Sequence, residues 1–179
     1  ETLAAYDQLI KQGKVRVIGA SNFTAARLAE ALKISAEKGL ARYECLQPHY
    51  NLVERGFEDE LEPLCLKEQV GVIPYYSLAS GFLTGKYRSE ADLGQSVRGG
   101  RMTAFMQGKG PAGLAAMDEI AAETGATLAR IALAWVAAQP GVTAPIASAT
   151  SLAQVEELVG SWNLALDRAQ LDRLTAAGA

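Results

Sequence analysis

The sequence predicts an α/β protein with a parallel sheet, and three observations support this class. Stretches with helical apolar spacing alternate with short apolar runs, in the order helix, then strand and helix, four times. Successive apolar runs are separated by one helix, which is the usual crossover between parallel strands. At 179 residues, with 49% hydrophobic and 21% charged residues, the chain has the size and composition of one globular domain.

Three helices and three strands are expected in the first half of the chain. The helices follow apolar stripes that begin at Leu3, Ala25 and Phe57; Thr24 caps the second, and Gly13 and Gly39 end the first two. Pro63 lies within the third stripe, so that helix either begins near Pro63 or is kinked there. The strands are expected at residues 14–19, 43–47 and 70–73, the last being apolar as in a strand buried on both faces.

The second half begins with an irregular stretch and then returns to the alternation. Residues 89–111 are polar and glycine-rich without a clear period, which is typical of a long loop that is either functional or disordered. Helices are expected at residues 114–125 and, after a Thr127 cap, 128–139, followed by a last strand at 142–146. Two capping-box spacings, Ser151 with Gln154 and Asp167 with Gln170, open the last two helices, the first with Val155, Leu158, Val159 and Trp162 on its inner face.

Charge and cysteine usage narrow the classes of partner. A net charge of −3 provides no basic stripe for nucleic acid, and no apolar run has the length of a membrane span. Cys45 and Cys65 have no metal-binding or redox spacing, so we expect reduced, buried thiols in a cytoplasmic protein and no metal site.

Polar or small side chains follow all four expected strands. They are Ser21 and Asn22, Gln47, Tyr76 and Ser77, and Ser148, Ala149 and Thr150. In parallel α/β folds, ligands bind at the carboxyl ends of the strands, so these groups should meet at one site. Each group alone could simply turn the chain or cap a helix, but four at equivalent positions favour a bound nucleotide.

The loop after the third strand has the composition of an anion-binding loop. Residues 77–86 read SLASGFLTGK, and small residues of this kind let backbone N–H groups approach a phosphate closely. Tyr76 beside the loop offers a flat face for a ring. Taken alone, the stretch fits a flexible surface loop equally well.

Four segments together resemble a known family. GKVRVIGASNF, LQPHYNLVER, GVIPYYSLASGFLTGKY and APIASATSLAQVEEL are similar to successive signatures of the aldo-keto reductases, in the right order and over nearly the whole chain. The third segment resembles the bacterial branch with a GxLTGK loop, which is also similar to the potassium-channel β-subunit reductases. The resemblance implies a (β/α)8 TIM barrel, with residues 1–179 forming one domain that covers about its second half, strands 5–8. It also implies NADP(H), covered by a long loop at about residues 77–111.

The resemblance further implies where the cofactor lies. Ser21, Asn22 and Gln47 would hydrogen-bond the nicotinamide carboxamide, and Tyr76 would stack on the nicotinamide ring. The pyrophosphate would lie along Ser77, Ala79, Gly81, Leu83 and Gly85, largely against backbone, with Lys86 nearby. The adenosine ribose phosphate would meet Ser148, Ala149 and Thr150, with Gln154 and Glu157 reaching adenine or ribose.

One departure concerns the choice between NADP and NAD. Many relatives carry an arginine or lysine near positions 148–154 to pair with the 2′-phosphate, but this segment has no cation. Arg98 or Arg101 from the long loop could supply the charge. NADP(H) therefore remains the expected cofactor, and NAD(H) is not excluded.

Catalysis in the family uses a tyrosine, a lysine, an aspartate and a histidine at the ends of the first barrel strands. This chain matches only the other half, so we expect no catalytic residue in it. His49 and Tyr50 could in principle donate a proton, but the YN segment favours structural roles for Tyr50 and Asn51 and a partly exposed His49. Tyr75 should point away from Tyr76 and pack among helices.

The expected function is NADPH-dependent reduction of a small carbonyl substrate, for which this chain supplies the cofactor-binding half. The alternative is a non-catalytic nucleotide-binding or regulatory half-barrel that pairs with another copy to cover its open sheet edges. A third and weaker hypothesis is a phosphate-sugar isomerase or aldolase, since barrels of this kind often bind phosphate after the late strands. It is weaker because no basic or Schiff-base residue is found at a strand end.

Overall fold

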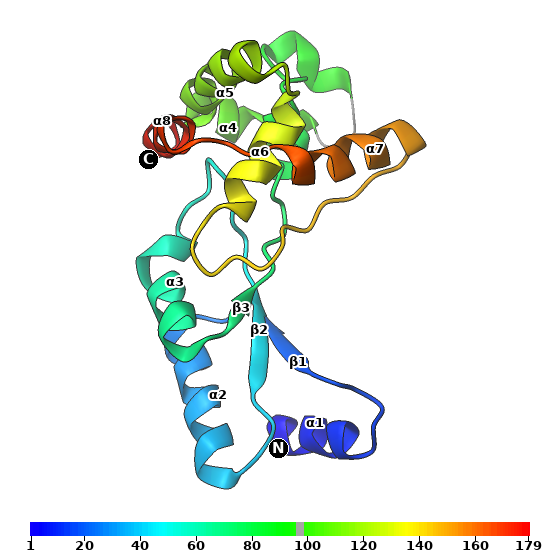
Figure 1. The fold of residues 1–179 in the computed structure, drawn as a ribbon, viewed down its shortest axis with the longest axis vertical. Coiled ribbons are helices and arrows are strands. Elements are labelled where there is room, and N and C mark those ends of the chain that lie inside the picture. Colours follow the sequence, from blue (N-terminus) through cyan, green and yellow to red (C-terminus); the bar gives the residue numbers. More distant parts are fainter. Residues whose placement is uncertain (96–98) are drawn as a thin grey trace.

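The computed structural model describes residues 1–95 and 99–179. Its elements are α1 (Thr2–Lys11), β1 (Ile18–Ser21), α2 (Ala25–Lys38), β2 (Tyr43–Gln47), α3 (Phe57–Glu68), β3 (Gly71–Val72), the 3₁₀ helices η1 (Ala79–Thr84), η2 (Glu90–Gln95) and η3 (Gly99–Arg101), then α4 (Thr103–Gln107), α5 (Gly110–Thr124), α6 (Leu128–Ala137), α7 (Leu152–Gly160), the 3₁₀ helix η4 (Ser161–Asn163) and α8 (Arg168–Ala177). Figure 1 shows the sheet with α1–α3 at one end of the molecule and α4–α8 gathered at the other.

Three parallel strands form the sheet, in the order β1-β2-β3. This confirms a parallel α/β arrangement with helical crossovers. Strand β1 begins at Ile18, later than the predicted start at residue 14, because β2 begins only at Tyr43, the partner of Ile18. Val17, just before the pairing starts, is 59% exposed.

The predicted fourth strand at residues 142–146 is wrong. Val142 makes a single parallel bridge to Val72, and the Thr143 and Ile146 amides donate to the Val72 and Pro74 carbonyls at 2.7 and 2.9 Å. The segment is extended beside β3, but β3 is only two residues long and offers too short a ladder for a strand. The polar residues that follow position 146 are nevertheless brought beside the end of β3.

Helix ends follow the predicted capping residues. The side chains of Thr24, Thr127, Ser151 and Asp167 each accept a hydrogen bond from a first-turn amide, and the box of Asp167 with Gln170 is complete. At Ser151 the box is only half formed, because the Gln154 side chain accepts from the Thr150 amide instead. Helix α3 begins at Phe57 and contains Pro63, so the alternative that the helix begins near Pro63 is wrong.

The stretch at residues 89–111 is more ordered than predicted. It contains η2, η3, α4 and the start of α5, although Arg98 lies outside the described residues. Asp92 organises the first turn by accepting from the Arg88 and Ser89 amides. Phe105 in α4 stacks on Phe82 in η1, with ring centroids 5.4 Å apart. These contacts hold the stretch against the loop that follows β3.

A polar and aromatic cluster fastens the loop after β2 to the helices at the other end of the molecule. The buried Tyr50 ring lies 5.7 Å from the ring of Trp135 in α6. Arg55 pairs with Glu58 at 2.6 Å and donates to the Thr175 carbonyl in α8, 120 residues away in the sequence. The Trp135 indole N–H donates to the Thr175 hydroxyl at 3.0 Å.

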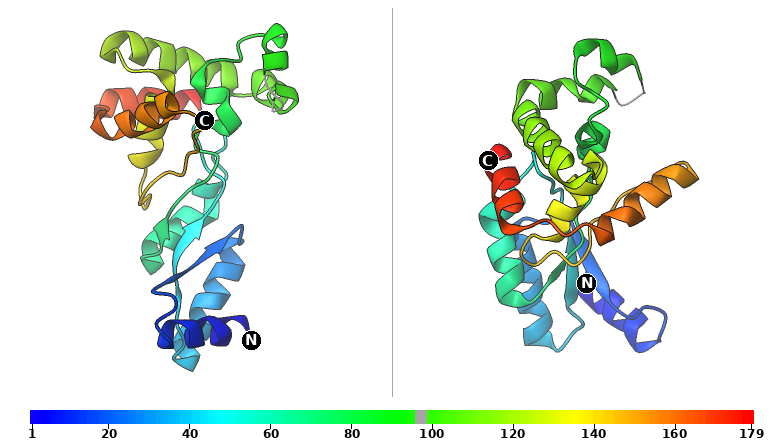
Figure 2. Two further views of the ribbon diagram at one scale, coloured as in Figure 1. Left: turned by 90° about the vertical axis from the view of Figure 1, so that its right-hand side faces the viewer. Right: turned by 45° about the horizontal axis from the view of Figure 1, so that its top comes forward.

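Helix α7 presents its apolar stripe to the outside, contrary to the prediction that it faces inward. Leu152, Val155 and Val159 in α7 are 74%, 46% and 54% exposed, and Trp162 in the following 3₁₀ helix η4 is 80% exposed. Figures 1 and 2 show α7 projecting from the other helices, so its outer side has no neighbouring layer. Half-buried Leu158 alone keeps the expected partly inward position.

Both cysteines are free, but the predicted burial holds only for Cys65, because Cys45 is half-buried. Burial raises the pKa of the Cys65 thiol to about 11. Within residues 1–95 and 99–179, no single helix combines the length and apolarity of a bilayer span; only α5 and α6 taken together would, and they bend by 101°.

Asp7 fastens α1 to the segment that leads into β2. Its carboxylate lies 2.6 Å from Lys11 Nζ and accepts from the Ala41 amide at 3.0 Å. The Lys11 hydrogen bond, followed by the Ala41 N–H, lowers the pKa of Asp7 below its ordinary value.

Replacing Asp7 by asparagine should therefore destabilise the fold at neutral pH but not in acid. A lowered folded-state pKa contributes stability that is present above the unfolded pKa of about 3.9 and lost as the pH falls through the folded value. Urea midpoints of wild-type and Asp7→Asn chains should differ at pH 7 and should approach each other as the pH falls below the unfolded pKa of about 3.9 and through the folded pKa of Asp7. A difference that is constant with pH would contradict this role.

Candidate functional site

Polar side chains from the ends of β1 and β2 lie together. Ser21 is paired with Gln47 across the sheet, and its hydroxyl donates to the Gln47 carbonyl at 3.0 Å. The backbone N–H of Asn22 donates to the same Gln47 carbonyl at 3.4 Å. Asn22 has a left-handed backbone with φ 56°, which turns the chain out of the strand.

Tyr75 belongs to this cluster, contrary to the prediction that it packs among helices. Its hydroxyl donates to Asn22 Oδ1 at 2.7 Å, and its ring stacks on His49 with centroids 5.4 Å apart and planes 15° from parallel. The prediction assumed strand alternation, but β3 ends at Val72 and Tyr76 has φ 55°. Alternation therefore no longer sets the directions of Tyr75 and Tyr76.

Tyr76 is held by the buried side chain of Asn51. Asn51 Nδ2 donates to the Tyr76 carbonyl at 3.0 Å, while its Oδ1 accepts from the Val53 and Glu54 amides, each at 3.0 Å. The Tyr76 ring is 47% exposed. Ser77 is buried and donates its hydroxyl to the Pro74 carbonyl at 3.1 Å. An aromatic face is thus presented at the strand end by a fully hydrogen-bonded turn.

The loop at residues 77–86 is a tight turn rather than an open cradle. Ser80 and Gly81 interrupt η1 with φ of 57° and 100°, and the side chains of Ala79 and Leu83 are buried. A Cβ on Gly85 would lie 2.4 Å from Leu128 Cδ1, so Gly85 packs against α6.

Several amides of this loop already have partners. The N–H groups of Ala79, Gly81, Leu83 and Gly85 donate to carbonyls of residues 76, 78, 78 and 82. Lys86 folds back over Gly81, since a Cβ there would lie 3.6 Å from Lys86 Nζ. The loop points the side chains of Ala79, Phe82 and Leu83 inward, and Lys86 Nζ lies over the buried Tyr87 ring, 5.0 Å from its centroid.

The residues predicted to meet the adenosine end lie on the segment that leads into α7. Ser148 and Thr150 are exposed and Ala149 is half-buried. Gln154 Oε1 accepts from the Thr150 amide at 2.7 Å and from its hydroxyl at 3.1 Å. The Glu157 carboxylate accepts from Thr127 and lies 3.1 Å from Arg130 Nε. Gln154 and Glu157 thus have partners within the protein, which a ligand would have to share or displace.

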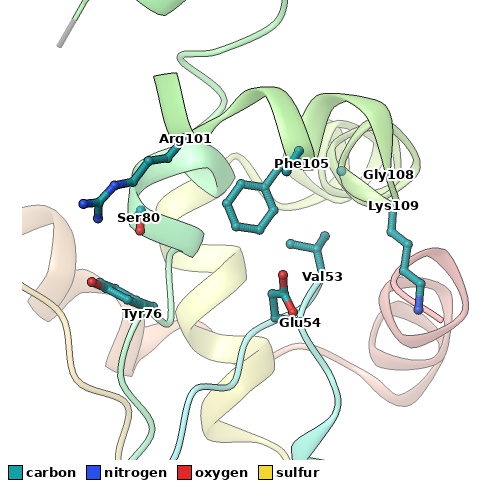
Figure 3. A pocket seen from close by; sticks show the side chains of 10 residues that line it. Val53, Glu54, Tyr76, Ser80, Arg101, Phe105, Gly108 and Lys109 are labelled. Carbon is teal, nitrogen blue, oxygen red and sulfur yellow. The ribbon is translucent and has the colours of Figure 1, made fainter. Parts of the chain in front are cut away.

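A pocket of about 460 Å³ opens beside Tyr76 (Figure 3). The residues around it come from three segments: Val53 and Glu54; Tyr76 and Ser80; and Arg101, Ala104, Phe105, Gly108, Lys109 and Gly110. The Arg101 guanidinium extends on the Tyr76 and Ser80 side of the pocket, and within the described chain it has no carboxylate partner (Figure 3). Sequence reasoning proposed Arg101 but missed Ser80, Glu54 and Phe105.

A second hollow of about 280 Å³ lies where the ends of β1 and β2 meet the start of α3. It is lined by Asn22, Phe23, Thr24, Leu46, Pro48, His49, Gly56, Phe57 and Leu61. No group of three or more potential metal ligands occurs among the residues that the structure describes.

His49 and Tyr50 do not form a proton-donor pair. Tyr50 is 1% exposed, and its hydroxyl donates to Glu58 at 2.7 Å; burial, followed by this bond to Glu58, raises the pKa of Tyr50. His49 is exposed and stacks on Tyr75. The predicted structural roles of Tyr50 and Asn51 are confirmed.

Comparison with known proteins places this geometry in a family. The family model described as the aldo/keto reductase family matches residues 1–179. Curated relatives include aldo-keto reductase dtxS3 of Metarhizium robertsii, 33% identical over 170 residues that cover 94% of this chain and 45% of that protein. Protein tas of Escherichia coli is 32% identical over 182 residues, covering 98% of this chain and 51% of the relative.

A third relative and a solved structure agree with these. A probable voltage-gated potassium channel subunit beta of Arabidopsis thaliana is 32% identical over 168 residues, covering 88% of this chain and 50% of that protein. The crystal structure of the thermostable aldo-keto reductase Tm1743 with the inhibitor epalrestat superposes with a TM-score of 0.77 at 27% identity, covering 99% of this chain and 54% of that chain. The chain thus spans about half the length of the curated relatives it matches.

Proposed function

Because the chain belongs to the aldo/keto reductase family, we propose that it binds NADP(H) and contributes to the reduction of aldehydes or ketones. The observation that carries the proposal is the polar and aromatic cluster at the carboxyl end of a parallel sheet, where Ser21 bonds to Gln47 and Tyr75 links Asn22 to Tyr76. We further propose that the chain is the second half of a (β/α)8 barrel and acts in the cytoplasm, where Cys45 and Cys65 stay reduced.

The residues at the strand ends fit a nicotinamide. A carboxamide needs both donors and acceptors, which the Gln47 amide and the Asn22 Nδ2 group can supply. The exposed Tyr76 ring is a platform of the right kind for stacking a flat heterocycle. When bound, NADPH would supply the hydride that reduces the carbonyl carbon, and the chain's own task is to orient the ring and exclude water from one face.

The residues expected to contact the adenosine ribose phosphate of the cofactor provide no positively charged side chain. Residues 148–154 have hydroxyls and the N-terminus of α7 but no cation. Among the described residues, Arg101 and Lys109 are the cations that line the pocket beside Tyr76, and Lys86 belongs to the loop that follows Tyr76. We assign Arg101 and Lys86 to the cofactor phosphates. The preference for NADP(H) over NAD(H) then depends on these two side chains more than on the α7 segment.

The chain alone is proposed to lack the proton donor for reduction. Tyr50 is committed to Glu58. Exposed His49 stacks on Tyr75 and meets the Tyr76 ring edge-on with centroids 5.4 Å apart, but it does not line the pocket beside Tyr76. The missing acid would come from the half of the relatives that this chain does not match.

Two measurements test the proposal. NADPH fluorescence titration of the 179-residue chain should show saturable binding, tighter for NADPH than for NADH. An NADPH-oxidation assay with a broad aldehyde should show no turnover by this chain and turnover by a version extended upstream. Absence of dinucleotide binding would overturn the proposed function, and turnover by the 179-residue chain would overturn the claim that its chemistry is incomplete.

A nucleotide-binding module that pairs with a second copy is the second candidate, and the exposed stripe of α7 favours it. Three exposed apolar side chains on α7, continued by Trp162 in η4, are an unusual surface for a monomer. Light scattering on the purified chain should then give a dimer mass that Val159→Glu reduces to that of a monomer. A monomeric wild-type chain would discard this candidate.

A further inference from the structure

We infer that Tyr75 is a positioning residue of the nicotinamide end of the site, acting through the side chain of Asn22. This inference rests on the proposed function, because it assumes that Asn22 meets the carboxamide. Tyr75 donates its hydroxyl to Asn22 Oδ1 at 2.7 Å, although the two residues are 53 positions apart in the sequence.

The hydrogen bond determines what Asn22 offers to a ligand. An asparagine amide has an acceptor oxygen and a donor nitrogen at opposite corners. With Oδ1 occupied by Tyr75, the Nδ2 group is left to donate, and the carboxamide oxygen of a nicotinamide is a matching acceptor. Asn22 is exposed and has a left-handed backbone, so without this bond its side chain would be free to turn.

Tyr75 is itself held firmly enough to act as a support. Its amide donates to the Pro48 carbonyl at 2.9 Å, and it makes a parallel bridge with His49. Its ring stacks on His49 at 5.4 Å and meets the Tyr76 ring edge-to-face at 5.1 Å. Tyr75 thus joins the β1 end of the site, at Asn22, to the ring platform at Tyr76.

The test is Tyr75→Phe, which removes the hydroxyl and keeps both ring contacts. Isothermal titration calorimetry on the full chain should show NADP⁺ binding weakened about 3- to 10-fold, as for the loss of one hydrogen bond. The affinity for adenosine 2′,5′-bisphosphate, which lacks the nicotinamide, should be unchanged. Tyr6→Phe, on α1 and outside the site, is the matched control and should leave both affinities unchanged.

The outcomes separate the inference from the proposed function. If wild-type protein binds neither ligand, the proposed function fails and the inference with it. If wild-type protein binds NADP⁺ and Tyr75→Phe binds it equally well, the inference alone is wrong. If Tyr75→Phe weakens both ligands to the same extent, the hydroxyl has only a general structural role, which also overturns the inference.

Discussion

Replacing Trp135 by alanine should lower the free energy of unfolding by about 3–5 kcal/mol. Trp135 is completely buried in α6, against Tyr50 and beneath the Arg55 guanidinium, whose central carbon lies 5.5 Å from the ring. Its indole N–H also donates to Thr175, so truncation opens a cavity and leaves a hydroxyl without its partner. Urea unfolding followed by circular dichroism measures the loss, which corresponds to a fall in Tm of roughly 6–20 °C for a chain of this size.

The chain contains its own control for this experiment. Its other tryptophan, Trp162, is 80% exposed, and Trp162→Ala should change the free energy of unfolding by less than about 0.5 kcal/mol. Trp135→Phe keeps much of the ring volume and should fall between the two. Equal losses for Trp135→Ala and Trp162→Ala would show that the cluster around Trp135 does not stabilise the fold.

Tyr76→Ala should weaken NADPH binding by about 10- to 100-fold, because stacking of a heterocycle on an aromatic side chain is worth roughly 1–3 kcal/mol. The ring is 47% exposed, so the loss comes from the missing platform rather than from the core. Tyr76→Phe, which keeps the ring, should bind NADPH within about threefold of wild type. Fluorescence titration measures all three affinities.

Backbone strain has to be separated from the loss of the ring in that comparison. Tyr76 has φ 55°. Alanine adopts this left-handed conformation at an energetic cost, whereas glycine adopts it without one. Tyr76→Gly should therefore weaken binding as much as Tyr76→Ala while leaving the turn intact. Retention of wild-type affinity by Tyr76→Gly would exclude Tyr76 as the platform.

Local signals in the sequence predicted local structure well. The caps at Thr24 and Asp167 depend on hydrogen bonds within one helical turn, and both are present. The strand at Tyr43–Gln47 lies at the centre of the sheet and has its predicted bounds. The meeting of Ser21 with Gln47 follows from the parallel order alone.

The wrong predictions concern features that neighbouring segments decide. Residues 142–146 have the apolar pattern of a strand, but a ladder needs a partner longer than Gly71–Val72. The stripe of α7 predicted burial, but pattern alone does not supply the layer that would cover it. Tyr75 was assigned by strand alternation, which the left-handed turn at Tyr76 cancels. Ser80 and Glu54 line the same pocket although they come from different segments, and no local pattern in the sequence indicates that these segments meet.

The hydrogen bond from Arg55 to the Thr175 carbonyl can form only late during synthesis on the ribosome, after α8 has been made. The segment with Asn51, which holds the Tyr76 carbonyl, and Arg55 leaves the ribosome before its anchor in α8, since Arg55 precedes Thr175 by 120 residues. Domains fold as units while the chain is made, so the turn that carries Tyr76 lacks this support until α8 is released. A nascent chain that has not yet released α8 therefore carries every residue of the Tyr76 platform without the support that holds it in place.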